Sequence, residues 1–114
     1  MSLRRGQIVL VNYPFTDQSA GKIRPALIVS ARACAPYDDY IVVPLSSRVS
    51  HDDFSMSLDR DASWFPQTKL RRQTRSIRWS ILLTVNVSVF HRKLGMMPSE
   101  LMKDILGRIR SLFQ

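Results

Sequence analysis

Hydrophobic positions in the first half of the chain come in short, nearly continuous runs separated by polar segments. Residues 7–13 are rich in β-favouring side chains and stop at Pro14, which predicts the first strand. Residues 25–30 form a second apolar run, and residues 40–46 form a third. Pro44 lies inside the third run and indicates a sheet edge, a bulge or a barrel corner, because proline cannot donate a backbone hydrogen bond.

The segments between and after these runs are more varied. Residues 15–23 and 32–39 carry turn-forming side chains and are expected to be loops. Residues 54–58 alternate apolar and polar positions, which indicates a short strand, and residues 76–85 have strong strand propensity throughout. Residues 63–75 lead from an aromatic pair into a stretch rich in Lys and Arg, which is compatible with a loop.

One segment near the end of the chain has helical periodicity. Its apolar side chains recur at helical spacing after Pro98, at Leu101, Ile105, Ile109, Leu112 and Phe113. We expect this stripe to pack the helix onto the sheet. Many short strands followed by one terminal helix predict a mainly β (α+β) fold, a small β-barrel with a C-terminal helix. At 114 residues the chain is expected to be a single domain covering residues 1–114.

Composition narrows the class of protein. Hydrophobic residues make up 45% and charged residues 23%, which is globular rather than disordered composition. The apolar runs are too short to span a membrane, and the first residues lack the apolar stretch of a signal peptide. The single cysteine, Cys34, cannot form an internal disulfide and is interpreted as passive packing. A cytoplasmic protein is therefore expected.

The charge is strongly positive and uneven. Seventeen Lys and Arg face nine Asp and Glu, which gives a net charge of +8. Beyond residue 60 only three acidic residues oppose ten basic ones, which are Lys69, Arg71, Arg72, Arg75, Arg78, Arg92, Lys93, Lys103, Arg108 and Arg110. Such a field attracts a polyanion, and the excess of Arg suits bidentate phosphate contacts. A nucleic acid is favoured as the partner, with an acidic protein or a merely solvated basic surface as the alternatives.

Two polar positions at strand ends are candidates for chemistry. Arg24 precedes Pro25, which restricts Arg24 to an extended conformation and makes it a plausible phosphate clamp or an ordinary surface arginine. Ser46 and Ser47 end the third strand, where a hydroxyl can face the same site or simply form a turn.

Other reactive residues give weaker signals. The two histidines, His51 and His91, would suit acid–base catalysis, but they lie in a variable loop and in a basic run. Cys, His and carboxylates do not cluster at metal-ligand spacing, so neither a metal nor another cofactor is expected.

The order of motifs along the chain resembles the MazF/PemK toxins. Residues 5–17 (Arg-Gly-Gln-Ile-Val-Leu-Val-Asn-Tyr-Pro-Phe-Thr-Asp) and 24–30 (Arg-Pro-Ala-Leu-Ile-Val-Ser) are similar to the opening of that family. Residues 42–47 (Val-Val-Pro-Leu-Ser-Ser) resemble its Val-Pro-x-Thr/Ser segment. Arg78 with Thr84 resembles its Arg-x-Asp-x-x-x-Thr stretch, and residues 92–95 with the terminal helix complete the series. Residues 49–73 match loosely.

The resemblance implies an SH3-like barrel of the MazF/PemK/CcdB type, usually a homodimer. It implies the toxin of a type II toxin–antitoxin system, bound by an acidic antitoxin of the MazE/PemI kind. It also implies metal-independent, sequence-specific cleavage of single-stranded RNA by attack of the RNA's own 2′-hydroxyl, which leaves a 2′,3′-cyclic phosphate and a 5′-hydroxyl. An enzyme of this kind needs to position the strand and stabilise charge on phosphorus rather than supply a nucleophile.

The same resemblance assigns roles to individual residues. Arg24 matches the arginine that contacts the scissile phosphate, Ser46 matches the catalytic Thr/Ser, and Arg78 matches a second arginine proposed as an acid. The RNA-binding positions implied are Thr16, Gln18, Ser19, Lys22, Ser47, Arg48 and Ser80.

Two positions depart from the PemK branch of the family. Ser80 stands where that branch has a carboxylate, and Gln18 stands where it has a loop histidine. A serine at its normal pKa is not a general base, so the Arg-x-Asp proton-transfer scheme does not carry over. Arg24 with Ser46 can suffice, as in other members. The alternatives are a catalytically impaired barrel that binds RNA or antitoxin, and a CcdB-like inhibitor of DNA gyrase.

Overall fold

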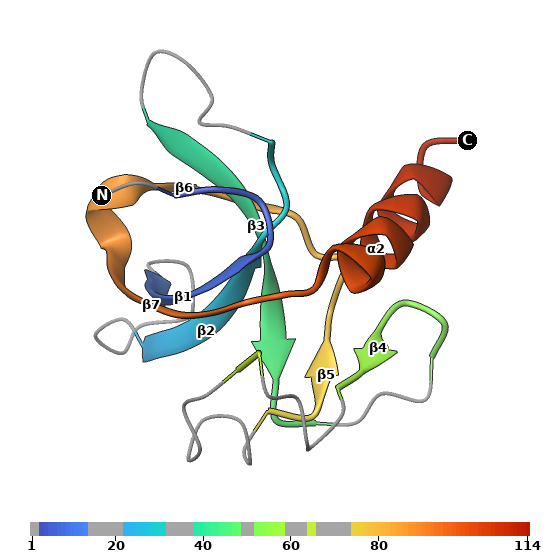
Figure 1. The fold of residues 1–114 in the computed structure, drawn as a ribbon, viewed down its shortest axis with the longest axis horizontal. Coiled ribbons are helices and arrows are strands. Elements are labelled where there is room, and N and C mark those ends of the chain that lie inside the picture. The colour runs from blue at the N-terminus through green and yellow to red at the C-terminus, as the bar shows by residue number, and fades with distance from the viewer. Residues whose placement is uncertain (1–2, 14–21, 32–37, 49–51, 59–63, 66–73) are drawn as a thin grey trace.

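The computed structural model describes residues 3–13, 22–31, 38–48, 52–58, 64–65 and 74–114. The elements found in these residues are shown in Figure 1. In chain order they are β1 (Gln7–Tyr13), β2 (Lys22–Ile28), β3 (Asp39–Ser46), β4 (Met56–Ser57), β5 (Ser76–Ile77), β6 (Leu83–Asn86), the 3-10 helix η1 (Val87–Val89), β7 (Phe90–Met96) and α2 (Ser99–Ser111).

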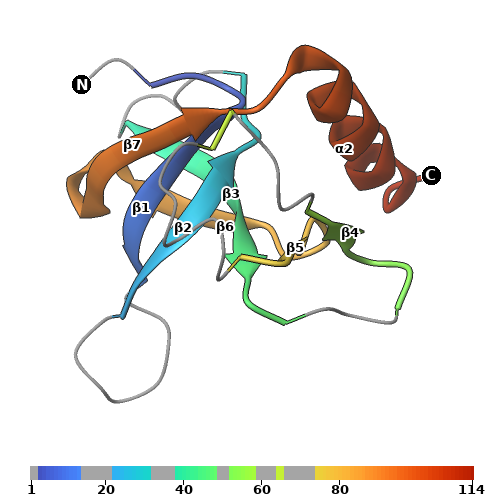
Figure 2. The same ribbon diagram turned by 60° about the horizontal axis from the view of Figure 1, so that its bottom comes forward.

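The strands form one antiparallel sheet. Its order is β4-β5-β3-β2-β1-β7, and β6 pairs with β3 off this path. The sheet curls so that β1, β2 and β7 turn away from α2, which stands on the side that also carries β4 and β5 (Figures 1 and 2). The predicted mainly β fold with a C-terminal helix is confirmed, and its curvature agrees with a barrel-like architecture. Within the described residues, strand pairing does not close the sheet into a ring.

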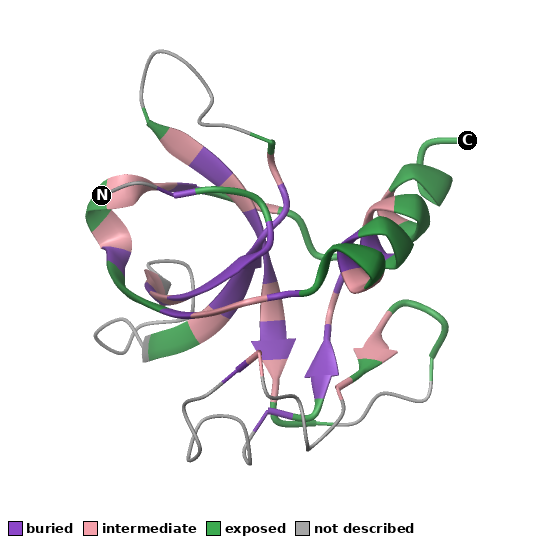
Figure 3. Ribbon diagram, viewed as in Figure 1, coloured by how far each residue is buried: buried purple, intermediate pink, exposed green. Residues whose placement is uncertain are grey.

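The central strands bury side chains on both of their faces, and Figure 3 shows the buried residues along them. Alternate positions of each strand point to opposite faces, so Ile8 and Leu27 enter one apolar cluster while Val9 and Ala26 enter the other. The helix-side core consists of Ile8, Leu27, Val29, Val43, Leu45, Phe65, Ile77, Trp79, Leu94, Met97, Met102 and Ile105. The far-side core consists of Leu3, Val9, Val11, Ala26, Ile28, Tyr40, Val42, Val85 and Phe90. Because side chains on both faces are buried, these strands appear in the sequence as continuous apolar runs.

Helix α2 covers the helix-side core. It begins after Pro98, whose backbone lies at φ −58°, and it buries Met102 and Ile105. Leu101 and Ile109 pack against the same core, as the periodicity predicts. The predicted stripe is wrong at its end, because the helix stops at Ser111. Its C-cap, Leu112, is 38% exposed, and the following residue, Phe113, is 74% exposed. None of the helices in the described part of the chain is long and apolar enough to span a membrane.

The strand prediction for residues 76–85 is wrong in one respect. The segment forms β5 and β6, which are separated by a turn. Both strands pair with the same edge of β3, since β6 pairs with residues 39–42 and β5 with residues 45–46. Pro44 lies between the β3 residues that pair with β6 and those that pair with β5, where the strand changes partner. Strand propensity alone does not reveal that two short strands share one neighbour.

Two further elements differ from expectation. Arg24 lies inside β2, which begins at Lys22, and not in the loop before the strand. Strand β7 was not predicted, because its residues His91, Arg92 and Lys93 are exposed and give no apolar pattern. Pairing with β1 holds β7 in the sheet.

A close approach at Gly95 joins β7 to residues 64–65. The Met96 amide donates a hydrogen bond to the Trp64 carbonyl over 3.2 Å, and the next side chain, Phe65, is fully buried in the helix-side core. A Cβ placed at Gly95 would collide with that Trp64 carbonyl oxygen. Glycine is therefore required here for steric reasons, because the obstacle is backbone and not a movable side chain.

We predict that Gly95→Ala lowers the free energy of unfolding by about 1–3 kcal/mol, the usual cost of overpacking. The matched control is Gly107→Ala in α2, where an added Cβ meets nothing within 4 Å. That substitution should raise stability by about 0.5–1 kcal/mol, because alanine is the better helix former. Chemical denaturation of the three proteins measures both changes. Equal stability of Gly95→Ala and the unsubstituted chain would contradict the steric argument.

Candidate functional site

Arg24 and Ser46 lie at the same end of the β2–β3 pair. Ala26 of β2 is paired with Pro44 of β3. Arg24 precedes Ala26 by two positions and Ser46 follows Pro44 by two, and the strands are antiparallel. Strand alternation therefore places both side chains on one face, at the rim of the far-side core. Arg24 is exposed and Ser46 is half-buried, so both can be reached from solvent.

Strand β5 brings a second pair of residues to the same face. Ser46 is paired with Ser76 of β5, and the Arg78 amide donates to the Pro44 carbonyl over 2.9 Å. Ser76 and Arg78 are two positions apart, so their side chains share the face of Ser46. Ile77 and Trp79 point the other way and are buried in the helix-side core. The buried indole of Trp79 thus directs Arg78 toward the candidate site.

The guanidinium of Arg78 is held in an incompletely satisfied state. Its Nε is buried, and it has no hydrogen-bond partner among the described residues. A buried donor without a partner is costly and is rare in folded proteins. Arg78 itself is half-buried on this face, and its guanidinium is a candidate ligand for phosphate. The Arg78 carbonyl accepts from the Ile81 amide over 3.1 Å, which closes the turn that contains Ser80.

The turn after β3 is fixed by two serines. The Ser46 Oγ accepts a hydrogen bond from the Arg48 amide over 3.1 Å. The Ser76 Oγ donates to the Arg48 carbonyl over 2.6 Å, and the Arg75 amide donates to the Ser46 carbonyl over 2.7 Å. Both polar groups of the Arg48 backbone are therefore tied to the sheet, while its side chain stays exposed. The Ser46 hydroxyl acts only as an acceptor in its contact with Arg48, which leaves its proton for another partner.

The structure therefore brings together Arg24, Ser46 and Arg78, with Ser47, Arg48 and Ser80 in the adjoining turns. Thr16, Gln18 and Ser19 lie outside the described residues, and so does the side chain of Lys22. Residues 34 and 51, the cysteine and the first histidine, also lie outside them, and His91 is an exposed residue of β7. The described residues contain no group of three His, Cys, Asp or Glu that could hold a metal ion.

Sequence reasoning missed Ser76. It is 1% exposed, and its hydroxyl is hydrogen-bonded to a backbone carbonyl 28 positions away. In the sequence it stands at the start of a β-favouring run, where a serine carries no signal. Only the pairing of β3 with β5 reveals that it faces the candidate site.

Solved structures share this fold. The MazE–MazF complex from Deinococcus radiodurans is 19% identical, covers 99% of this chain and 97% of that chain, and has a TM-score of 0.74. An endoribonuclease in complex with its cognate antitoxin, from a mycobacterial species, is 17% identical over 96% and 93% of the two chains, with a TM-score of 0.72. The Mycobacterium tuberculosis toxin MazF-mt6 is 16% identical over 94% and 95%, with a TM-score of 0.62. At these identities the likeness establishes the fold alone.

Sequence comparison identifies the family to which the protein belongs. No sequence among the curated proteins matches this chain. The family model described as the PemK-like, MazF-like toxin of type II toxin–antitoxin systems matches residues 4–113. Because that match runs through nearly the whole chain, the protein belongs to the PemK-like, MazF-like toxins of type II toxin–antitoxin systems.

Proposed function

We propose that this toxin is an endoribonuclease that cleaves single-stranded RNA in the cytoplasm without a metal ion. The observation that carries the proposal is the convergence of Arg24, Ser46 and Arg78 on one face at the end of β2, β3 and β5. Membership of the toxin family and the fold shared with structures described as endoribonucleases support it. An acidic antitoxin and a second copy of the chain are the proposed protein partners.

The chemistry requires few protein groups. The 2′-hydroxyl gives up its proton to water and its oxygen attacks the adjacent phosphorus. The bond from phosphorus to the 5′-oxygen breaks, and the departing 5′-oxygen takes up a proton, which leaves a 2′,3′-cyclic phosphate and a 5′-hydroxyl. Negative charge grows on the phosphoryl oxygens during this step. The guanidinium groups of the exposed Arg24 and the half-buried Arg78 are donors suited to that charge. The Ser46 hydroxyl, which accepts from the Arg48 amide and can still donate its own proton, is proposed as a third donor.

Ser80 leaves the site without the carboxylate that the PemK branch has at this position. It occupies a half-buried position in the turn after β5, two residues beyond Arg78. A hydroxyl at its ordinary pKa does not accept a proton from the 2′-hydroxyl. The rate enhancement therefore rests on orientation and charge stabilisation by Arg24, Ser46 and Arg78 rather than on a carboxylate base.

The phosphate contacts extend beyond the reacting atoms. Arg48 is exposed in the turn after β3, and its backbone is fixed by Ser46 and Ser76. A neighbouring phosphate of the same strand is a suitable partner for its side chain. Thr16, Gln18, Ser19, Lys22 and Ser47 remain the proposed contacts to the rest of the RNA. Single strands fit such a site because their unstacked bases can turn outward.

The first prediction from the proposed function concerns Arg24. We expect Arg24→Ala to lower kcat/KM for a single-stranded RNA by roughly a hundred- to a thousandfold, the usual loss for one transition-state donor. Arg92→Ala, an equally exposed arginine on β7, should cleave at the rate of the unsubstituted protein. The assay is run in EDTA, and the products are analysed for the cyclic phosphate. RNA that binds but stays intact would indicate an impaired barrel, and gyrase inhibition without cleavage would indicate the CcdB-like alternative.

The second prediction separates two adjacent serines. Ser46→Ala removes a hydroxyl on the same face of the sheet as Arg24 and should lower kcat by about tenfold or more, with a smaller effect on KM. Ser47→Ala, one position further into the exposed turn, should act on KM and leave kcat within about twofold of the original value, because Ser47 is proposed to contact the RNA away from the reacting atoms. Steady-state cleavage kinetics on both variants measure the difference. Equal losses in the two variants would remove Ser46 from the reacting centre.

The third prediction assigns a positioning role to Ser76. Ser76→Ala leaves the Arg48 carbonyl without its buried donor and should cost about 1 kcal/mol of stability. It should also weaken RNA binding and reduce the salt slope by about one, as loss of one phosphate contact does. Ser57→Ala, on the strand paired with Ser76, is the control. In an Arg48→Ala background Ser76→Ala should add nothing to the loss of binding, and full additivity would show that Ser76 does not act through Arg48.

A further inference from the structure

Strand β4 lies at the edge of the sheet, beside the strand that leads to Arg78 (Figures 1 and 2). Met56 of β4 is paired with Ile77 of β5. In an antiparallel pair each step back along one strand is a step forward along the other, so Ser55 stands opposite Arg78. Residues opposite each other share a face of the sheet, which places Ser55 on the face of the candidate site. The turn before β4 therefore borders that site.

The same register continues into this turn. Phe54 and Trp79 are the next opposite positions, and their ring centroids lie 6.0 Å apart. The position after them sets Asp53 opposite Ser80. Asp53 is exposed and Ser80 is half-buried. Since Ser80 follows Arg78 by two positions, alternation places Asp53 and Ser80 on the face of Arg78.

Hydrogen bonds fix the backbone on both sides of this contact. The Asp52 Oδ1 accepts from the Phe54 amide over 2.9 Å, which closes a turn around Asp53. The turn that contains Ser80 is closed by its own backbone hydrogen bond over 3.1 Å. A ligand that uses Asp53 and Ser80 together therefore has little backbone to order on binding.

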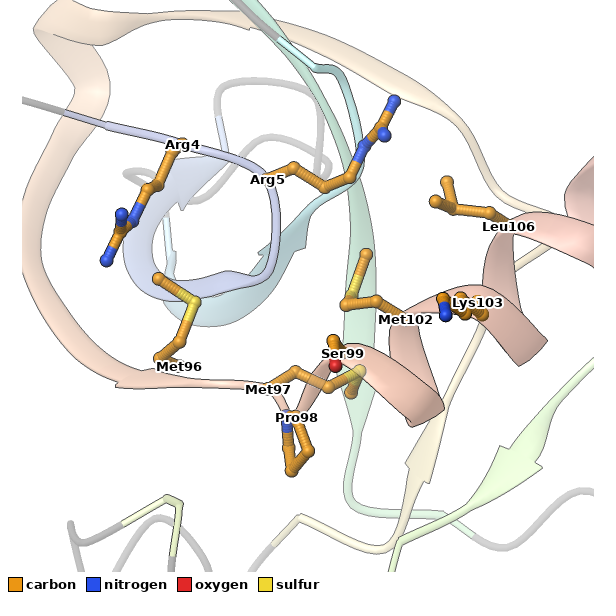
Figure 4. A pocket seen from close by; sticks show the side chains of 9 residues that line it. All are labelled: Arg4, Arg5, Met96, Met97, Pro98, Ser99, Met102, Lys103 and Leu106. Atoms are coloured by element: carbon orange, nitrogen blue, oxygen red, sulfur yellow. The ribbon is translucent and has the colours of Figure 1, made fainter.

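The carboxylate of Asp53 is exceptional on this side of the molecule. Of the other acidic residues in the described part of the chain, residues 38–39 lie at the opposite end of β3. Glu100 and Asp104 belong to α2, whose first turns line a cavity on the other side of the sheet (Figure 4). Asp52 is engaged in its own turn. Among the described residues, Asp53 is therefore the carboxylate that is placed to meet a ligand of the candidate site.

A carboxylate serves a different purpose from the arginines beside it. It repels the phosphates that Arg24 and Arg78 attract, so its partners on an RNA strand are the N–H groups of a base. Two positions of a chain span at most about 7 Å. Asp53 and Ser80 thus lie within reach of the base of a nucleotide whose phosphate is held at Arg78.

Guanine is the base whose edge matches a carboxylate. Its Watson–Crick edge presents two adjacent donors, N1–H and the N2 amino group, to the two carboxylate oxygens. Adenine and cytosine present one amino donor beside an acceptor nitrogen, and uracil presents one N–H between two carbonyl oxygens, so each of them sets an acceptor against a carboxylate oxygen. The guanine O6 lies next to N1 and can accept from the Ser80 hydroxyl. In a single strand this edge is free to be read.

We propose that Asp53 is a specificity-determining residue, which selects a guanine close to the scissile phosphate, and that Ser80 is its second contact. The proposal rests on the proposed RNA site, because it takes the path of the strand from Arg24 and Arg78. It gives Ser80, which is not a general base, a role in recognition.

The first test measures binding in the absence of cleavage. Labelled 2′-fluoro RNA strands of uracil, which lack the attacking hydroxyl, carry one central guanine, hypoxanthine or 7-deazaguanine, and binding is followed by fluorescence anisotropy at about 0.15 M salt. The guanine and 7-deazaguanine strands should bind roughly five- to a hundredfold more tightly than uracil alone, the usual range for a bidentate base contact. Hypoxanthine lacks the N2 amino group and should lose most of this gain. Equal binding of the guanine and hypoxanthine strands would overturn the proposal.

A matched pair of variants assigns the effect to one carboxylate. Asp53→Asn places an amino group where an oxygen accepted, so it should bind the guanine and hypoxanthine strands within about twofold of each other. Glu100→Gln removes the same charge from an exposed position on α2 and should keep the full preference for guanine. Any general gain from the lost negative charge is common to both variants. An unchanged preference in Asp53→Asn would contradict the assignment.

The second test maps cleavage within an RNA of randomised sequence. Sequencing of the fragment ends should show guanine enriched at one position relative to the cut, and Asp53→Asn should abolish that enrichment. An equal loss of cleavage at every site in Asp53→Asn, with an altered pH profile, would make Asp53 an acid–base group and overturn the specificity role. Selective binding of guanine without any cleavage would contradict the proposed ribonuclease activity while supporting the guanine site.

Discussion

The structure depends on burying both faces of one curled sheet. In β1, β2 and β3 successive residues enter opposite cores, so these strands tolerate polar side chains only near their ends. Each face then needs its own cover. Helix α2 supplies one, and the curl of the sheet through β6, η1 and β7 supplies the other, where Tyr40 and Phe90 lie with ring centroids 5.7 Å apart. The polar residues of the candidate site are therefore confined to strand ends, where Arg24 and Ser46 lie on one face.

The second constraint is the shared edge of β3. Residues 39–42 of β3 pair with β6 and residues 45–46 pair with β5, so one strand serves two neighbours in succession. This arrangement places Arg78 beside Pro44 and Ser76 beside Ser46. A continuous strand over residues 76–85 could not pair Ser76 with Ser46 and also Leu83 with Val42, because these two pairings have different registers along β3. The turn at Trp79 and Ser80 accommodates this change of register.

Local patterns were enough to predict the fold class, the first three strands and α2, and the ordered motifs were enough to predict the family. The features that local patterns did not predict depend on contacts between distant parts of the chain. Strand β7 is held by its pairing with β1, although its own side chains are charged, and Phe113 lies beyond the end of α2 despite its helical spacing. Ser76 acts on a turn 28 positions away, which no local pattern encodes. Arg24, Ser46 and Arg78 could be named because resemblance carried information that periodicity lacks.

The basic residues behind the net charge of +8 form two groups in different environments. Exposed charges interact weakly beyond about 8–10 Å at physiological salt, and the molecule measures 34 × 34 × 28 Å, so cations on opposite faces of the sheet act as separate groups. At the strand end, Arg24 and Arg78 stand with serine hydroxyls, an environment that offers a phosphate only polar donors. At α2, Arg4 and Lys103 line a cavity together with Met96, Met97 and Met102. The two groups of cations therefore have different neighbours, hydroxyls in one case and thioethers in the other.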